Sequence, residues 1–146
     1  MENETRFLTF LTAGCTLAAA LFGFGASMFS FQGAYEDNPV FVGAVQLMRV
    51  LALLVLALVL VFRGGWRGVI AAGCMVVGAT FLEWLFYPFS FTLASVSDPA
   101  GYAARFGEVT RPGYAEWAVF DIFFITIAAA LAQSLRVIAF IRPRDE

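Results

Sequence analysis

The chain alternates between four long apolar segments and short polar connections. The apolar segments run over residues 7–31, 40–62, 69–91 and 114–141. An α-helix needs about 20 residues to cross a hydrocarbon core ~30 Å thick, and each segment reaches that length. Their residues do not alternate with the two-residue period of a membrane β-strand. The pattern predicts an all-α polytopic membrane protein: a four-transmembrane-helix bundle with short loops, forming a single membrane domain over residues 1–146.

The connection between the third and fourth segments has room for a further short helix. Asp98 is a suitable N-cap, and Pro99 suits the first helical position. A helix over residues 99–106 places Tyr102 and Phe106 on one face, four residues apart. We expect this helix to lie at the outer membrane interface. It would act as a lid or docking surface, or simply as an anchor for the loop.

Composition supports the assignment to a membrane and excludes several classes of function. Hydrophobic residues make up 61% of the chain and charged residues 14%, whereas soluble domains are about 45–50% apolar and about 25% charged. The net charge of −2 gives no reason to expect nucleic-acid binding. The absence of histidine excludes Ser-His-Asp triads and most haem and zinc sites. Cys15 and Cys74 both lie in apolar segments and form no CxxC motif, so we interpret them as reduced packing residues. No cofactor or metal site is expected.

The distribution of arginine predicts the orientation in the membrane. All nine basic residues are arginine, and the absence of lysine suggests a GC-rich genome. If all four segments cross, six arginines fall on one side and two on the other. Cytoplasmic loops carry the excess of basic residues. We therefore expect a bacterial cytoplasmic (inner) membrane protein with both termini in the cytoplasm. The first group is Arg6, Arg63, Arg67, Arg136, Arg142 and Arg144, and the second is Arg105 and Arg111.

Three charged residues lie well inside the apolar segments, at similar depths. Counting the rise per residue, Arg49 lies ~14 Å, Asp121 ~10 Å and Glu83 ~9 Å below the outer side. Each of the three would be costly facing lipid. The sequence therefore predicts that Arg49 meets Glu83, Asp121 or both inside the bundle.

This predicted cluster has two interpretations. One arginine between two acids leaves an odd negative charge, so the second acid is expected to hold a proton, as in a proton relay or a cation-coupled carrier. Alternatively, Arg49 and one acid form an interhelical tie while the other acid is neutral and hydrogen-bonded. The structural interpretation is favoured. Pro88 either kinks the third helix beside Glu83 or ends it, and an ending is favoured.

Two further sets of residues have expected structural roles. Small residues at helical spacing permit close helix approach; they are Gly14, Ala18, Gly23, Cys74 and Gly78. Aromatic residues near the outer ends of the segments are expected to form an interfacial belt; they are Trp84, Tyr87, Tyr102, Phe106 and Trp117.

Three functions are compatible with these features. The favoured hypothesis is a non-catalytic membrane subunit or assembly factor of a larger membrane complex, with lipid and other membrane subunits or a second copy as partners. The alternative is a small proton- or cation-coupled transporter or channel that works as an oligomer through Arg49, Glu83 and Asp121. A further alternative is an enzyme acting on a lipid or quinone. No nucleophile or headgroup-binding cluster accompanies its acids, so no catalytic residue is assigned.

Overall fold

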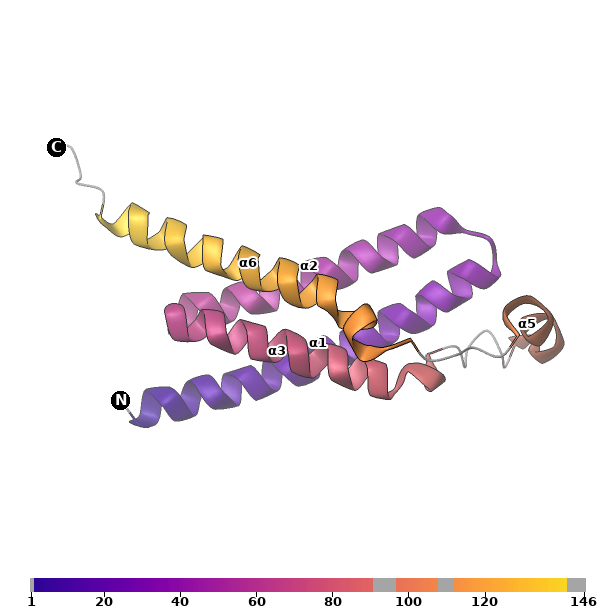
Figure 1. Ribbon diagram of the computed structural model, residues 1–146, viewed down its shortest axis with the longest axis horizontal. Coiled ribbons are helices and arrows are strands. Elements are labelled where there is room, and N and C mark those ends of the chain that lie inside the picture. Colours follow the sequence, from indigo (N-terminus) through magenta and orange to yellow (C-terminus); the bar gives the residue numbers. More distant parts are fainter. Residues whose placement is uncertain (1, 91–96, 108–111, 142–146) are drawn as a thin grey trace.

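The computed structural model describes residues 2–90, 97–107 and 112–141, and the described part is helical throughout. Four helices are long and apolar enough to span a bilayer. The sequence prediction of an all-α bundle of four transmembrane helices is confirmed. The long helices are α1 (Glu2–Tyr35), α2 (Pro39–Gly64), α3 (Trp66–Leu85) and α6 (Tyr114–Ile141); the short ones are the 3-10 helix η1 (Tyr87–Phe89) and α5 (Pro99–Phe106) (Figure 1).

The third spanning helix is shorter than the sequence suggested. We expected a helix over residues 69–91, but α3 ends at Leu85 and passes into η1. Pro88 explains the difference, because proline lacks an N–H and disfavours helical conformation in the residue before it. Pro88 therefore ends α3 rather than kinking it. The continuation over residues 91–96, expected to follow the interface, lies outside the described residues.

The long helices run alternately up and down, so α1 begins and α6 ends at the same end of the bundle (Figure 1). We call this the terminal end, and the opposite end, where α5 lies, the α5 end. Helix α3 contacts each of the other three long helices, whereas α1 and α6 lie on opposite sides of the α2–α3 pair. The α2–α3 pair is therefore the centre of the fold.

Small side chains fill much of the core, and large ones cover the outside. Buried alanines occur in all four long helices and permit close approach of their backbones. Exposed Phe, Leu, Ile and Val side chains occur on the outer faces of the same helices. This arrangement suits a lipid environment rather than water. The buried alanines include Ala19, Ala57, Ala72, Ala79 and Ala129.

A tight turn holds α2 and α3 together at the terminal end. Gly65 joins the two helices with a φ of 57°, a conformation that glycine adopts without steric cost. Gly68, one turn into α3, lies directly against the backbone of Leu60, so a Cβ atom here would collide with the Leu60 carbonyl. The turn therefore requires glycine at both positions.

Helix α5 occupies the range that the sequence predicted and is attached to the end of α1. The Asp98 side chain caps it by accepting a hydrogen bond from the Gly101 N–H (3.1 Å) and another from the Tyr35 hydroxyl. The Tyr35 hydroxyl, followed by the Gly101 N–H, holds the pKa of Asp98 below its ordinary value. Arg105 forms an ion pair with Asp37 and donates to the Tyr35 carbonyl at 2.7 Å. The acidic α1–α2 turn thus binds α5.

We predict that Gly68→Ala will destabilise the bundle by about 1–3 kcal/mol, the usual cost of inserting a methyl group into a packed site. The collision is with backbone, which cannot rotate away. The measurement is the free energy of unfolding in mixed micelles titrated with sodium dodecyl sulfate. Gly14→Ala is the matched control, because a Cβ atom at Gly14 meets no atom within 4 Å. Equal stabilities of the two variants would contradict this account of the turn.

Candidate functional site

The structure brings the three intramembrane charges together. The Arg49 Nε and Nη2 atoms both donate to Glu83 Oε2, at 3.0 and 2.7 Å. The Arg49 Nη1 atom lies 2.7 Å from Asp121 Oδ2. All three residues are buried. A single guanidinium thereby connects α2 with both α3 and α6, and we call Arg49, Glu83 and Asp121 the charge triad.

Each charge lies on the buried stripe of its own helix. On α2, Arg49 is followed at intervals of four residues by the buried Leu53 and Ala57. On α6, Asp121 is followed at the same interval by the buried Ile125 and Ala129. Residues four apart share a helix face. The apolar stripes that form the core therefore also direct the charges into it, and the same holds for Glu83, which follows the buried Val76 and Ala79 on α3.

Helix α1 completes the site without contributing a charge. Gly23 lies so close to the Glu83 carboxyl that a Cβ atom would overlap Oε1. Glu83 Oε1 is buried, and no hydrogen-bond partner for it is found among the described residues. Gly23 was expected to serve helix packing in general. The structure gives it a more specific role, since it makes room for a carboxyl oxygen against the α1 backbone.

The charges of the triad balance only when a proton is added. Two ionised carboxylates and one guanidinium carry a net charge of −1. An isolated buried charge is costly in a low-dielectric interior. Arg49 already directs three N–H groups at Glu83 and Asp121, and the remaining oxygen, Glu83 Oε1, faces Gly23. The arrangement can hold one proton in addition to the arginine.

A pocket of about 250 Å³ lies one helical turn from the triad on its α5 side. Tyr87 follows Glu83 by four residues, and Trp117 precedes Asp121 by four. Their rings meet at 5.3 Å in an edge-to-face arrangement. Burial raises the pKa of the Tyr87 hydroxyl above its ordinary value. The pocket is lined by Ser27, Ser30, Phe31, Ala34, Val42, Gln46, Tyr87 and Trp117.

Two polar features of this pocket matter for what it can bind. Gln46, one turn from Arg49, donates to the Ser30 hydroxyl at 2.8 Å and so joins α2 to α1. The indole N–H of Trp117 is buried, and no acceptor for it is found in the described part of the chain. The pocket can therefore offer a hydrogen bond to a small polar molecule or to water approaching from the α5 end.

The opposite side of the triad is closed. One helical turn from the triad toward the terminal end, each of the three helices places an apolar residue that is fully or almost fully buried. These residues are Leu53 on α2, Ala79 on α3 and Ile125 on α6. Further apolar side chains fill the next turns, with Ala57, Leu60, Met75, Val76 and Ala129 among them. The apolar core thus closes the triad on its terminal side.

The predicted aromatic residues gather at the α5 end, attached to the bundle. Trp84 donates its indole N–H to the Pro112 carbonyl at 2.8 Å. Tyr102 is buried and lies 4.9 Å from Phe106, ring to ring. Phe106 in turn meets the Phe31 ring of α1 at 6.5 Å. These rings therefore connect α5 to α1, in addition to any contact with lipid.

The expected set of packing residues needs correction. Gly23 and Gly78 do lie at helix contacts, and a Cβ atom at Gly78 would meet the Thr16 methyl group at 2.9 Å. Gly14, Ala18 and Cys74 instead lie on exposed surface. Helix α1 has small residues on more than one face, so spacing alone did not identify the face that packs.

Several residues of structural importance were not singled out from the sequence. Tyr114 donates to the Val77 carbonyl at 2.8 Å and lies 3.1 Å from the Thr80 hydroxyl, which joins the start of α6 to α3. Gln46 and Gly68 were missed as well. A polar residue one turn from a buried charge was the available signal for Gln46, whereas Gly68 depends on the geometry of the turn.

The cysteines and acidic residues are the side chains that could contribute to a metal site. No group of three or more Cys, Asp or Glu side chains there is arranged to hold a metal ion. Cys15 is buried and Cys74 is exposed, and both are free thiols. In the triad, arginine occupies the place between the two carboxylates that a cation would otherwise take.

Fold and site together define a multi-pass, all-α membrane protein with a buried ion triad shared by three of its four spanning helices. Comparisons of the chain with protein-family models, curated protein sequences and solved structures found no match.

We predict that Arg49→Leu will lower the free energy of unfolding by about 3–5 kcal/mol, because it leaves two acids buried without their cation. Glu83→Gln should cost far less, since its amide oxygen still accepts from Arg49 and Asp121 still balances the guanidinium. Unfolding by sodium dodecyl sulfate in mixed micelles measures both. An Arg49→Leu protein as stable as wild type would show that the triad does not hold the helices together.

Proposed function

We propose that the chain is a non-catalytic integral membrane subunit or assembly factor of a larger membrane complex. The observation that carries this proposal is the closed state of its interior. The triad connects helices, and fully buried apolar side chains close the bundle on its terminal side. An interior of this kind supports a scaffold better than a passage for solutes.

The outer surface is where such a subunit would act. Helix α6 packs against α3 and α2 and leaves its other side free. That side carries Phe120 and Phe124, whose rings stack in parallel 5.9 Å apart, and both are exposed. Flat aromatic surfaces of this kind suit contact with another membrane helix. We place the partner contact on this face of α6.

The proposal includes a location and an orientation. Described arginines are more frequent at the terminal end, which holds Arg6, Arg63, Arg67 and Arg136, than at the α5 end, which holds Arg105. Arg111, Arg142 and Arg144 lie outside the described residues. The positive-inside rule then places the terminal end in the cytoplasm. We propose a bacterial cytoplasmic membrane as the location, and the exclusive use of arginine fits a GC-rich genome.

Gentle extraction from native membrane, followed by native electrophoresis and quantitative mass spectrometry, tests the subunit proposal. We expect one companion protein at a fixed molar ratio. The double variant Phe120→Ala/Phe124→Ala should reduce the amount of this companion, because it removes the aromatic surface of α6. Phe10→Ala on α1 is the control, since it removes an exposed ring from a different helix. A lone, stable chain in every extract would count against the proposal.

A second candidate is a small proton- or cation-coupled transporter. It is favoured by Glu83 Oε1, the buried carboxyl oxygen without a hydrogen-bond partner among the described residues, and by the pocket that approaches the triad from the α5 end. Transport would further require the apolar side to open, which an oligomer or a second conformation would have to provide.

For the transporter candidate, we predict that Glu83→Gln and Asp121→Asn each abolish proton-coupled flux in reconstituted liposomes while the folded protein remains. A pH-sensitive dye inside the vesicles measures the flux. Glu116→Gln is the control, because Glu116 is an exposed acid in the first turn of α6. Normal flux in both triad variants would refute this candidate.

A further inference from the structure

A long groove runs along the surface between α1 and α3. Its largest section has a volume of about 660 Å³ and is bounded by Leu8, Ala13 and Leu17 of α1 and by Ala71, Cys74 and Leu82 of α3. A second section of about 290 Å³ shares Leu17 and Leu82 with the first and continues toward the α5 end. The two sections therefore form one apolar channel, open to the membrane, which we call the α1–α3 groove.

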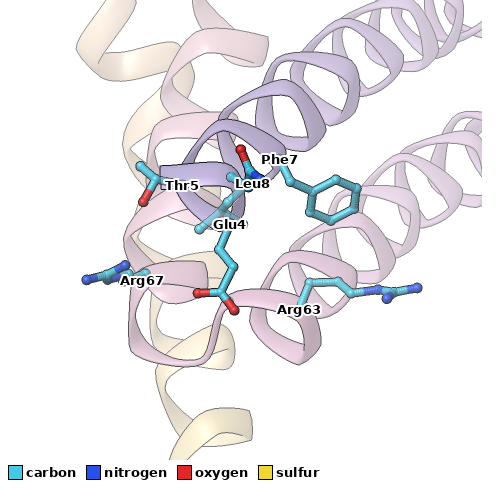
Figure 2. Close-up of a pocket in the computed structure, with 8 residues that line it drawn as sticks. Glu4, Thr5, Phe7, Leu8, Arg63 and Arg67 are labelled. Atoms are coloured by element: carbon cyan, nitrogen blue, oxygen red, sulfur yellow. The ribbon is translucent and has the colours of Figure 1, made fainter. Parts of the chain in front are cut away.

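The groove opens at the terminal end into a pocket of different character. This pocket, of about 460 Å³, includes Arg63 and Arg67 at the α2–α3 turn and Glu4 at the start of α1. It shares Thr5, Leu8 and Arg67 with the groove, so the two are continuous. Figure 2 shows the Glu4 carboxylate between the two arginines, whose guanidinium groups point away from it on opposite sides.

The two arginines are not used by the fold. Neither Arg63 nor Arg67 has an ion-pair or hydrogen-bond partner within the described part of the chain. Other arginines at helix ends are engaged: Arg136 donates to the Phe62 carbonyl at 3.0 Å, and Arg105 pairs with Asp37. Together with Glu4, the pocket carries a net charge of +1, equal and opposite to that of one phosphodiester group.

The polar side chains that line the groove already have hydrogen-bond acceptors within their own helix. Thr9, Thr12 and Thr16 donate their hydroxyl protons to carbonyls one turn earlier in α1, at 2.9, 2.7 and 2.8 Å. Their polar groups are therefore satisfied within the helix, as the membrane interior requires. The surface offered to an occupant is made of methyl, methylene and thiol groups.

We propose that the α1–α3 groove binds one anionic phospholipid. Its phosphate would lie at the terminal end of the groove beside Arg67, which lines both the pocket and the groove, with Arg63 adding positive charge to the same pocket, and one acyl chain would follow the groove. From Arg67 to Leu82, α3 rises ~22 Å, which exceeds the ~15 Å depth of one leaflet. The net charge of +1 in the pocket favours a lipid phosphate over a partner helix, since an apolar helix face would leave that charge unbalanced. This proposal is independent of the function proposed above.

Native mass spectrometry of the full chain, titrated with phosphatidylglycerol or phosphatidylcholine, tests the proposal. We expect one phosphatidylglycerol per chain, bound more tightly than phosphatidylcholine. Arg63→Gln and Arg67→Gln should each weaken phosphatidylglycerol binding about fivefold, since a basic residue at a membrane surface contributes about 1 kcal/mol. Arg105→Gln makes the same charge change at the other end and should have no effect. Equal binding of both lipids, or equal weakening by Arg105→Gln, would overturn the proposal.

A second variant tests the groove itself. Ala13→Phe fills the groove and should weaken phosphatidylglycerol binding, whereas Ala44→Phe, at an exposed position of α2 outside every groove section, should not. Both positions are exposed, so neither change disturbs the core. Undiminished lipid binding in Ala13→Phe would overturn the proposal. So would the loss of a dimer or of a companion protein in its place, which would identify the groove as a protein interface.

Discussion

The rest of the structure depends on the need to keep one arginine paired inside a medium of low dielectric. In water an ion pair such as Arg49 with Glu83 contributes little, because each partner is solvated on its own. Inside a bilayer neither group has that alternative, and separation leaves a charge exposed to hydrocarbon. Arg49 therefore fixes how α2 is rotated toward α3 and α6, and the apolar stripes around it follow the same rotation.

This constraint accounts for the unequal roles of the four helices. Helices α2 and α3 meet through the triad, through the Gly68 contact and through the apolar core. Helix α6 joins them through Asp121 and Tyr114. Helix α1 packs its Gly23 against Glu83, and its Ser30 accepts a hydrogen bond from Gln46 of α2, but it contributes no charge to the triad. Its remaining surface is consequently available to form a groove with α3.

Much of the fold and part of the site could be predicted from the sequence, because the length of a helix and the depth of a residue along it follow from counting residues. Segment length predicted the spanning helices, and the rise per residue placed Arg49, Glu83 and Asp121 in one layer. Rotation about a helix axis was the quantity that could not be derived. Helix α1 has small residues on more than one face, so the sequence did not separate Gly23, which contacts Glu83, from Gly14, which faces outward. Pro88 was expected to end the third helix, but the sequence did not predict that the helix would already end at Leu85.

The order of the helices along the chain has a consequence for biogenesis. Arg49 lies on α2 and emerges from the ribosome before either of its acids. Its partner on α3 follows 34 residues later, after a turn that brings the two helices side by side. The α2–α3 hairpin is therefore the smallest segment that can leave an insertion channel for lipid with its arginine neutralised. Asp121 arrives last, at a guanidinium already in place, so the charge triad is completed only when α6 joins the hairpin.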